Sequence, residues 1–443
     1  MDHARAVPDM TRTVGLLTLA LGVAPVPVAA AQDLVLTNGH IVDPARRTVV
    51  EGGVWIRDGK IAGVGPVPAD ATGERIDLGG RWVIPALHDL HTHSFGNQGP
   101  GRVFDGGGTQ ATAERVLRAG VTSFLDLFNQ EAYIFGLRAG QRAGTLGGAE
   151  IFASGPCFTA TRGHCSEYGV PTRIIDSPDD ARKQLADLAP KRPDVVKLVY
   201  DHFDYGPNSL PSVDRPTMEA LLAAAGERGL KTVIHVGTWQ DVREVVLAGA
   251  TAVTHLPRGD TVPDDLVRLM AARGVYHIPT LVVHQDLSAL LTQPELVASP
   301  LFAALTGETL RKAYARGLDS LEPRYRAVVN RQIASRPAML ESVRRLAAAG
   351  VSMLTGTDAG NVGVVQGYSV HREMLRLVEA GLTPWDALRA STTNAGKFLG
   401  RAYGVGPGDQ ADLVVLDASP LEDIANTQTI GLVVMRGRVV YRR

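Results

Sequence analysis

Between residues 82 and 400 the sequence repeatedly alternates short apolar, β-branched stretches with helical stretches. Strands are predicted near Trp82 and in VTSFLDL, EIFAS, DVVKLVY, KTVIHV, TAVTHL, VYHIPTLVV and VSMLTGTD. Predicted helices such as DDARKQLADLA and MEALLAAAGERGL separate them, and several end on glycine, as helices often do. Eight such units predict an α/β fold of the closed (β/α)8 TIM-barrel type. An open, doubly wound sheet is the alternative, but no glycine-rich phosphate loop opens the first helix.

Both ends of the chain have a different sequence pattern, in which short strand-like stretches follow one another without helices between them. Residues 32–84 contain the turn pairs Asn38-Gly39 and Asp58-Gly59 between alternating strand-like stretches, and residues 401–443 contain Arg436-Gly437 in the same setting. Neither end has enough strands for a core of its own. We therefore expect the two ends to pair into one small β-sandwich domain, with the barrel formed by residues 85–400.

Candidate metal ligands occur at the carboxyl ends of the predicted strands. His91 and His93 are two residues apart, so in a strand both face the same side. The other candidates are Lys197, His235, His255 and Asp358. These strand ends meet at one face of a barrel, where active sites of that fold lie. Neutral imidazoles and a carboxylate suit divalent cations, and the two groups of ligands leave room for two ions.

Lys197 is the unusual member of this set. A protonated ammonium group would repel a metal ion, whereas a lysine carbamate, formed with carbon dioxide, carries two oxygens and one negative charge and can bridge two cations. Taken alone, a lysine at a strand end more often reaches solvent or forms a salt bridge. The other ligands favour the carbamate.

The first 31 residues have the three parts of a secretory signal peptide. Arg5 and Arg12 precede an apolar run, Val14 to Val23, and small residues follow at Ala29-Ala30-Ala31. The apolar run is too short to span a bilayer stably. An exported protein, periplasmic or secreted, is therefore expected, with a disordered or helical extension as the alternative. In an oxidising compartment Cys157 and Cys165 could pair.

Composition narrows the class of partner. The 443 residues are 45% hydrophobic and carry a net charge of −1, which predicts a globular protein with a large core. The sequence has no basic stripe of the kind that binds DNA or RNA, so nucleic acid is not an expected partner.

The segments PALHDLHTH, VVKLV, VIHVG, VTHLP and LTGTDAG resemble the amidohydrolase superfamily. The resemblance is to its binuclear members with a carboxylated lysine, which include Xaa-Pro and Xaa-Arg dipeptidases and imidazolonepropionase-like proteins. Imidazolonepropionases proper use one metal without the lysine, so Lys197 argues against that activity. The chain departs from the family's usual Pro-Gly-hydrophobic-Asp pattern at Ala86, Leu87 and His88.

The resemblance implies a ligand set. His91 and His93 would hold one metal with Asp358, His235 and His255 would hold the second, and carboxylated Lys197 would bridge them. Zinc is the default ion for such a site, although manganese or cobalt is also compatible with the ligands.

Further roles are expected for residues around these ligands. Two ions would lower the pKa of a shared water, and Asp358 would carry its proton to the leaving amine. His164 resembles a family histidine that donates to the substrate carbonyl or oxyanion, although a solvent-exposed loop histidine is equally expected. Tyr200 and Arg162 are candidates for binding a substrate carboxylate. Residues 287–336 are too long for an ordinary connection and would form a lid or an oligomer contact.

These observations predict an exported, metal-dependent amidohydrolase that cleaves the amide bond of a dipeptide, an N-acyl amino acid or a similar small molecule. Hydrolysis of a lactone, an ester or a cyclic amide by the same cluster is one alternative. A metal-binding or ligand-binding protein without catalytic activity is the other.

Overall fold

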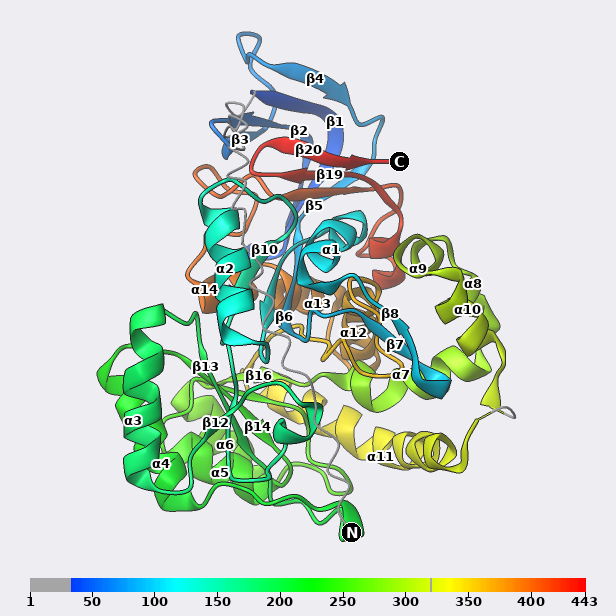
Figure 1. The fold of residues 1–443 in the computed structure, drawn as a ribbon. Helices are drawn as coiled ribbons and strands as arrows, with labels where there is room; N and C mark the ends of the chain where they lie inside the picture. The colour runs from blue at the N-terminus through cyan, green and yellow to red at the C-terminus, as the bar shows by residue number, and fades with distance from the viewer. Residues whose placement is uncertain (1–32, 319–320) are drawn as a thin grey trace, which may run out of the picture.

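The computed structural model describes residues 33–318 and 321–443, and consists of a β-rich end and a larger α/β body (Figure 1). The predicted signal peptide, residues 1–31, lies outside the described residues. Within the described ranges, no helix has the length and apolar character needed to cross a membrane.

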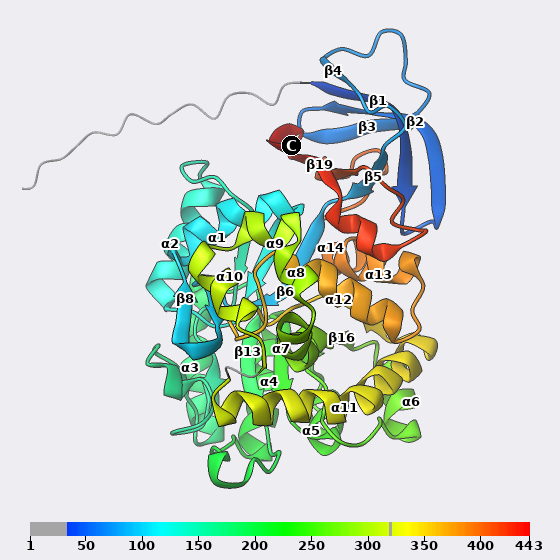
Figure 2. The ribbon, with the colours of Figure 1, turned by 90° about the vertical axis from the view of Figure 1, so that its right-hand side faces the viewer.

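Strands from both ends of the chain form one eight-stranded sheet. The strands are β1 (Leu34–Asp43), β2 (Thr48–Arg57), β3 (Lys60–Gly65), β4 (Glu74–Asp77), β5 (Trp82–Pro85), β18 (Leu413–Leu416), β19 (Ile430–Met435) and β20 (Arg438–Arg442). Their order is β20-β19-β18-β5-β1-β2-β3, with β4 paired to β1. β18 runs antiparallel to β5, so the C-terminal strands complete the layer begun by the N-terminal ones. Figure 2 shows this unit at one end of the α/β body.

The body contains two parallel sheets. The first has the order β10-β9-β6, from β6 (Leu87–Thr92), β9 (Val121–Asp126) and β10 (Glu150–Ala153). The second has the order β12-β11-β13-β14-β15-β16-β17. Its strands are β11 (Phe158–Thr159), β12 (Arg173–Ile174), β13 (Val196–Tyr200), β14 (Thr232–Val236), β15 (Ala252–Thr254), β16 (Tyr276–Ile278) and β17 (Ser352–Met353). The body is therefore mixed α/β with parallel strands, as the alternating pattern predicts.

Hydrogen bonds join the edges of the two parallel sheets. On one side, the Leu90 amide donates to the Thr355 carbonyl at 2.9 Å and the His93 amide donates to the Ala359 carbonyl at 2.7 Å. On the other side, the Asp194 amide, just before β13, donates to the Ala153 carbonyl at 2.9 Å. The segment that follows the last strand thus lies directly beside the first strand.

Helices separate successive strands and cover the sheets. They are α1 (Gly108–Arg115), α2 (Glu131–Arg142), α3 (Pro178–Leu188), α4 (Arg215–Glu227), α5 (Trp239–Leu247), α6 (Asp264–Arg273), α12 (Tyr368–Glu379), α13 (Pro384–Ser391) and α14 (Thr393–Leu399). Side chains cap several of them: Ser177 accepts from the Asp180 amide in α3, and Thr238 forms a capping box with Asp241 in α5.

The seventh predicted strand is shorter than its sequence suggests. VYHIPTLVV reads as one strand, but β16 covers only Tyr276–Ile278, and Leu281 begins helix α7 (Leu281–Thr292). Pro279 interrupts the β pattern and Thr280 has a left-handed backbone with φ 48°. Both changes favour a turn over a continued strand. His284, which directly follows this stretch of sequence, therefore lies on a helix.

The long segment after the seventh strand is helical. Residues 287–336 comprise the second half of α7, then α8 (Pro294–Ala298), α9 (Pro300–Leu305), α10 (Glu308–Ala315) and the first part of α11 (Pro323–Ala348). α10 packs on the hairpin formed by β7 (Asn97–Gly99) and β8 (Val103–Asp105), where the Tyr314 hydroxyl donates to the Gln98 carbonyl at 2.9 Å. The expected roles of residues 287–336 as a lid or an oligomer contact stay predictions.

Candidate metal centre and active site

A cavity of about 600 Å³ opens at the carboxyl ends of the parallel strands. All of the metal ligands expected from the sequence line it, namely His91, His93, Lys197, His235, His255 and Asp358. They come from β6, β13, β14, and the residues that follow β6, β15 and β17. Residues up to 267 positions apart in the chain therefore meet in one cavity because parallel strands end on the same side.

The tightest group consists of His91, His93 and Asp358. One ligand atom from each lies within 4.8 Å of the others, which is a spacing that can hold a cation. Nε2 of His93 is 2.9 Å from Oδ1 of Asp358, and Nε2 of His91 is 3.3 Å from the same oxygen. The Asp358 amide donates to the His91 carbonyl at 2.7 Å, so backbone pairing between first and last strands brings the ligands together.

His235, His255 and Lys197 form the neighbouring group. The His235 and His255 rings have centroids 4.3 Å apart, and the His255 ring lies 5.0 Å from that of His91. Lys197 is only 3% exposed, and its Nζ has no hydrogen-bond partner among the residues that the structure describes. A buried amine without a partner is costly, so this atom is poised for a ligand or a modification.

Hydrogen bonds orient three of the imidazoles. Nδ1 of His91 lies 2.7 Å from Oγ1 of Thr254, and Nδ1 of His255 lies 2.8 Å from Oγ1 of Thr280. These contacts leave Nε2 of both rings as the nitrogen available to a metal.

His235 uses the opposite nitrogen, because its Nε2 lies 3.2 Å from Oδ2 of Asp201. Nδ1 of His235 is then the free ligand atom. A histidine held by a carboxylate in this way is a common arrangement around bound metals.

Burial sets the protonation of these groups. It lowers the pKa of His91 and His255 well below the ordinary range, and the positive charge of Lys197 contributes in both cases. It also lowers the pKa of His235 to about 4, although the hydrogen bond with Asp201 acts in the opposite direction. At neutral pH these imidazoles are neutral, which is the form that binds metal.

The same burial lowers the pKa of Lys197 to about 7, against the opposing effect of the negative charge on Asp358. A substantial share of the amine is therefore unprotonated near neutral pH.

The backbone is strained at the ligands and their supports. His255, Thr280 and Asp358 have φ values of 74°, 48° and 59°, in the left-handed region that non-glycine residues seldom adopt. Such conformations persist where the surrounding structure holds them, and they are concentrated at functional sites. Together with the neutral imidazoles, the carboxylate and the unpaired Nζ of Lys197, these features fit a divalent metal centre.

His164 lies in the cavity, as expected. Its Nδ1 is 2.5 Å from Oε1 of Glu167, and its ring centroid is 5.1 Å from that of His235. A disulfide between Cys157 and Cys165 ties down the loop that carries it. The pairing of these cysteines, one option in the sequence, is thus present in the structure.

The two other expected substrate-binding residues lie elsewhere. The Tyr200 hydroxyl donates to Glu244 on α5, and its side chain is 2% exposed. Tyr200 is three positions after Lys197 in β13, so it points to the opposite face of the sheet. Arg162 is exposed and does not line the cavity. The structure therefore does not place either side chain where a bound substrate would reach it.

Other residues take part in the site that the sequence did not single out. Thr254 and Thr280 orient ligands, and Asp201, Tyr205 and Arg258 line the cavity. Strand alternation offered a signal for Asp201, because it lies four positions after Lys197 and therefore on the same face. No comparable periodicity marks Arg258, which lies in a loop.

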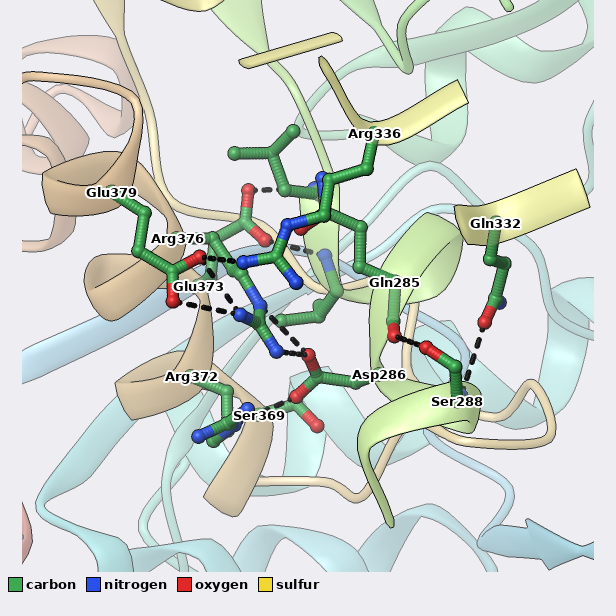
Figure 3. Close-up of polar contacts among 12 residues, drawn as sticks. Gln285, Asp286, Ser288, Gln332, Arg336, Ser369, Arg372, Glu373, Arg376 and Glu379 are labelled. Atoms are coloured by element: carbon green, nitrogen blue, oxygen red, sulfur yellow. Dashed lines mark hydrogen bonds and ion pairs between the residues drawn. The ribbon is translucent and has the colours of Figure 1, made fainter. Parts of the chain in front are cut away.

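A buried ion cluster joins α12 to α7 (Figure 3). On α12, Arg372 and Arg376 bind Asp286 of α7, with N–O distances of 2.7–2.9 Å. Glu373 of α12 accepts hydrogen bonds from the amides of Leu281 and Val282, both at 2.9 Å. These amides begin α7 and directly follow Thr280, so the cluster also fixes the residue that orients His255.

Known proteins resemble this chain over most of its length. Residues 82–440 match the family model described as the amidohydrolase family. Ochratoxinase from Aspergillus niger is 22% identical over 384 residues, which cover 77% of this chain and 71% of that protein. Imidazolonepropionase from Geobacillus thermodenitrificans is 26% identical over 433 residues, with 89% and 92% coverage.

Solved structures show the same fold. The crystal structure of a Xaa-Pro dipeptidase with bound methionine aligns with a TM-score of 0.73 at 19% identity, over 93% of this chain and 100% of that chain. The crystal structure of A. niger ochratoxinase aligns with a TM-score of 0.69 at 19% identity, over 93% and 96%. This chain is a member of the amidohydrolase family, and it is a hydrolase that acts on carbon–nitrogen bonds.

Proposed function

We propose that the protein is a metal-dependent amide hydrolase whose substrates are dipeptides, N-acyl amino acids or similar small molecules. The observation that carries this proposal is the convergence of four histidines, an aspartate and an unpaired buried lysine in one cavity. Relatives named ochratoxinase, imidazolonepropionase and Xaa-Pro dipeptidase are consistent with amide chemistry.

The scaffold in this proposal is a closed (β/α)8 barrel, residues 85–400, carrying a β-sandwich built from residues 32–84 and 401–443. Support for closure comes from the hydrogen bonds that join Leu90 to Thr355 and Ala153 to Asp194. Support for the sandwich comes from the antiparallel pairing of β18 with β5.

The site would hold two divalent ions, with zinc as the expected metal. His91, His93 and Asp358 would bind one ion, and His235 and His255 the other, with carboxylated Lys197 between them. Carboxylation joins the unprotonated Nζ to the carbon of carbon dioxide and releases one proton. The lowered pKa of Lys197 supplies the unprotonated amine that this step needs.

When bound, the metal ions would activate a water molecule and polarise the substrate carbonyl. Asp358 would accept the proton of that water on a carboxylate oxygen and deliver it to the nitrogen of the leaving amine. In its imidazolium form, His164 would donate from Nε2 to the substrate oxygen, because its Nδ1–H already donates to Glu167 and a neutral ring has only one N–H. Its hydrogen bond would be strongest when that oxygen carries negative charge.

The mature enzyme would act outside the cytoplasm. The proposal rests on the signal-peptide pattern of residues 1–31, and the disulfide between Cys157 and Cys165 supports it because disulfides form in oxidising compartments.

Metal content and substrate range test the proposal together. Purified wild-type protein, Lys197→Ala and the exposed-lysine control Lys183→Ala would be analysed for metal per chain and assayed on a dipeptide, an N-acyl amino acid and a lactone. We expect about two ions in wild type and the control, fewer in Lys197→Ala without rescue by bicarbonate, and turnover of an amide.

About one ion in all three proteins would contradict the bridging role of Lys197. Turnover of the lactone alone would favour the esterase alternative, and bound metal without any turnover would favour a binding protein.

A further inference from the structure

One end of the cavity is lined by cationic and polar side chains that do not belong to the metal centre. Arg258, three residues after His255, reaches this end together with Tyr205 and His284. Arg258 and His284 also line an adjoining pocket of about 100 Å³, which α11 closes with Arg331 and Gln332. The two spaces therefore share Arg258 as a boundary.

Arg258 carries a positive charge that no carboxylate in residues 33–318 and 321–443 neutralises by direct contact. No carboxylate of the described residues lies within 4.0 Å of its guanidinium, which is instead 5.7 Å from the centroid of the Tyr205 ring. Other partly or fully buried arginines behave differently. Arg138 pairs with Asp194 at 2.5 Å, and Arg173 pairs with Glu131 at 2.5 Å.

The carboxylates nearest this end are already engaged. Asp201 accepts from the Tyr205 hydroxyl at 3.0 Å and contacts His235, while Glu167 is bound to His164. They are therefore held by other partners. The charge of Arg258 remains available to a group that enters the cavity.

His284 adds a second unmet polar atom at the same place. Its side chain projects from α7, the residue is 8% exposed, and its Nε2 has no hydrogen-bond partner within the described part of the chain. The ring lies 5.9 Å from that of His255. A buried nitrogen without a partner usually indicates a missing ligand or water.

We propose that Arg258, assisted by His284, binds a carboxylate of the substrate and thereby selects amides that carry a free carboxylate, such as N-acyl amino acids and dipeptides. This inference rests on the proposed amide hydrolase function and names its substrate class. A guanidinium presents paired N–H donors that match the two oxygens of a carboxylate, and the Arg258 guanidinium lies over the Tyr205 ring, 5.7 Å from its centroid. The substrate would then be anchored at this end and cleaved at the metal centre.

The test compares an N-acyl amino acid, N-acetyl-L-leucine, with its uncharged counterpart, N-acetyl-L-leucinamide, on zinc-loaded enzyme. The variants are Arg258→Met, Arg258→Lys and the control Arg268→Met, an exposed arginine on α6. In Arg258→Met we expect kcat/KM for the acid to fall at least ~30-fold, mostly through KM, because the charge pair between the guanidinium and the substrate carboxylate is lost. In the same variant, kcat/KM for deacetylation of N-acetyl-L-leucinamide should change less than ~3-fold. Arg258→Lys should recover part of the loss on the acid.

A binding measurement separates this inference from the proposed function. Calorimetric titration of the zinc-loaded wild type with L-leucine and with L-leucinol compares a carboxylate with a hydroxymethyl group without any turnover. We expect tighter binding of leucine, and loss of that preference in Arg258→Met but not in Arg268→Met.

Equal losses on the charged and uncharged substrates would overturn the inference by assigning Arg258 a structural role, and so would an unchanged preference for leucine in Arg258→Met. If wild type cleaves neither substrate, the proposed function fails for this class, and the titration alone decides whether Arg258 binds carboxylates.

Discussion

The cavity with the candidate metal ligands and the ion cluster between α7 and α12 both bury ionisable side chains, but they differ in how many hydrogen-bond and ion-pair partners they provide. In the ion cluster, Asp286 is bound by two arginines, and Glu373 is bound by two backbone amides. In the cavity, Nζ of Lys197, Nδ1 of His93 and Nε2 of His284 have no partner among the described residues. Buried polar groups that are fully paired stabilise a fold, whereas those left unpaired are available to ligands.

The pKa values follow the same division. Burial alone would raise the pKa of Asp286, but the charges of Arg376 and Arg372 lower it below its ordinary value, so the carboxylate stays ionised. In the cavity, burial prevails and the pKa of Lys197 falls to about 7. In the ion cluster, the charged partners therefore keep Asp286 ionised. In the cavity, Lys197 has too few charged partners to offset burial, so its neutral form is favoured.

The largest effect is expected from Asp358→Asn in the cavity. The amide cannot accept and release a proton, so kcat should fall by about 10²- to 10⁴-fold while the far-ultraviolet circular dichroism spectrum stays unchanged. The control is Asp265→Asn, on the exposed side of α6. Near-normal turnover in Asp358→Asn with normal metal content would refute the proton-transfer role.

Asp286→Ala should instead damage stability. It leaves the buried guanidinium groups of Arg372 and Arg376 without their shared partner, which typically costs about 3–5 kcal/mol of unfolding free energy. Glu379→Ala, at a side chain that is 33% exposed, should cost less than about 1 kcal/mol.

Urea denaturation of both variants measures the two costs. Metal content per folded chain should stay at the wild-type value in both, because neither residue lines the cavity. If Asp286→Ala lost metal but kept wild-type stability, the ion cluster would act on the metal centre and not on the stability of the fold.

Thr254→Val tests the hydrogen bond that orients His91. Valine has the same shape but cannot bond Nδ1, so zinc affinity should weaken by about 10- to 100-fold with little change in stability. Competition with a chelating dye measures the affinity. The matched control is Thr217→Val on α4, whose hydroxyl has no described hydrogen-bond partner; equal zinc affinities in the two variants would argue against an orienting role for Thr254.

The smallest effect is a pH dependence at Glu373. Burial raises its pKa from 4.5 to about 8, although the two backbone amides act in the opposite direction. Between these pH values the folded protein keeps a proton that the unfolded chain has released, so this residue makes stability fall as pH rises towards 8. Glu373→Gln removes that dependence.

At pH 5 the glutamine variant should be less stable than wild type by about 1 kcal/mol, because its amide offers one acceptor to two backbone donors. The difference should shrink as the pH approaches 8. Guanidinium denaturation across this range measures it, and a difference that stays constant from pH 5 to pH 8 would show that Glu373 is ionised throughout in the folded protein.

Strand periodicity explains which site residues could be predicted. His91 and His93 share a face because they are two positions apart in a strand, and the same rule places Tyr200 on the opposite face from Lys197. The expected carboxylate-binding role of Tyr200 did not take this alternation of faces into account. His284 was harder to place, because its helix begins only where Pro279, Thr280 and Glu373 end the strand pattern.

The amino-acid sequence by itself determined the alternation of strands and helices and the position of each candidate metal ligand at a strand end, because both depend on patterns within a few residues. The tertiary structure decided which distant groups meet. Thr254 reaches His91 across 163 positions, and Asp201 reaches His235 across 34. It also left Arg258 without a carboxylate partner among the residues that the structure describes. Such pairings depend on how the parallel strands stack and where the loops end, and no local pattern in the sequence encodes those distances.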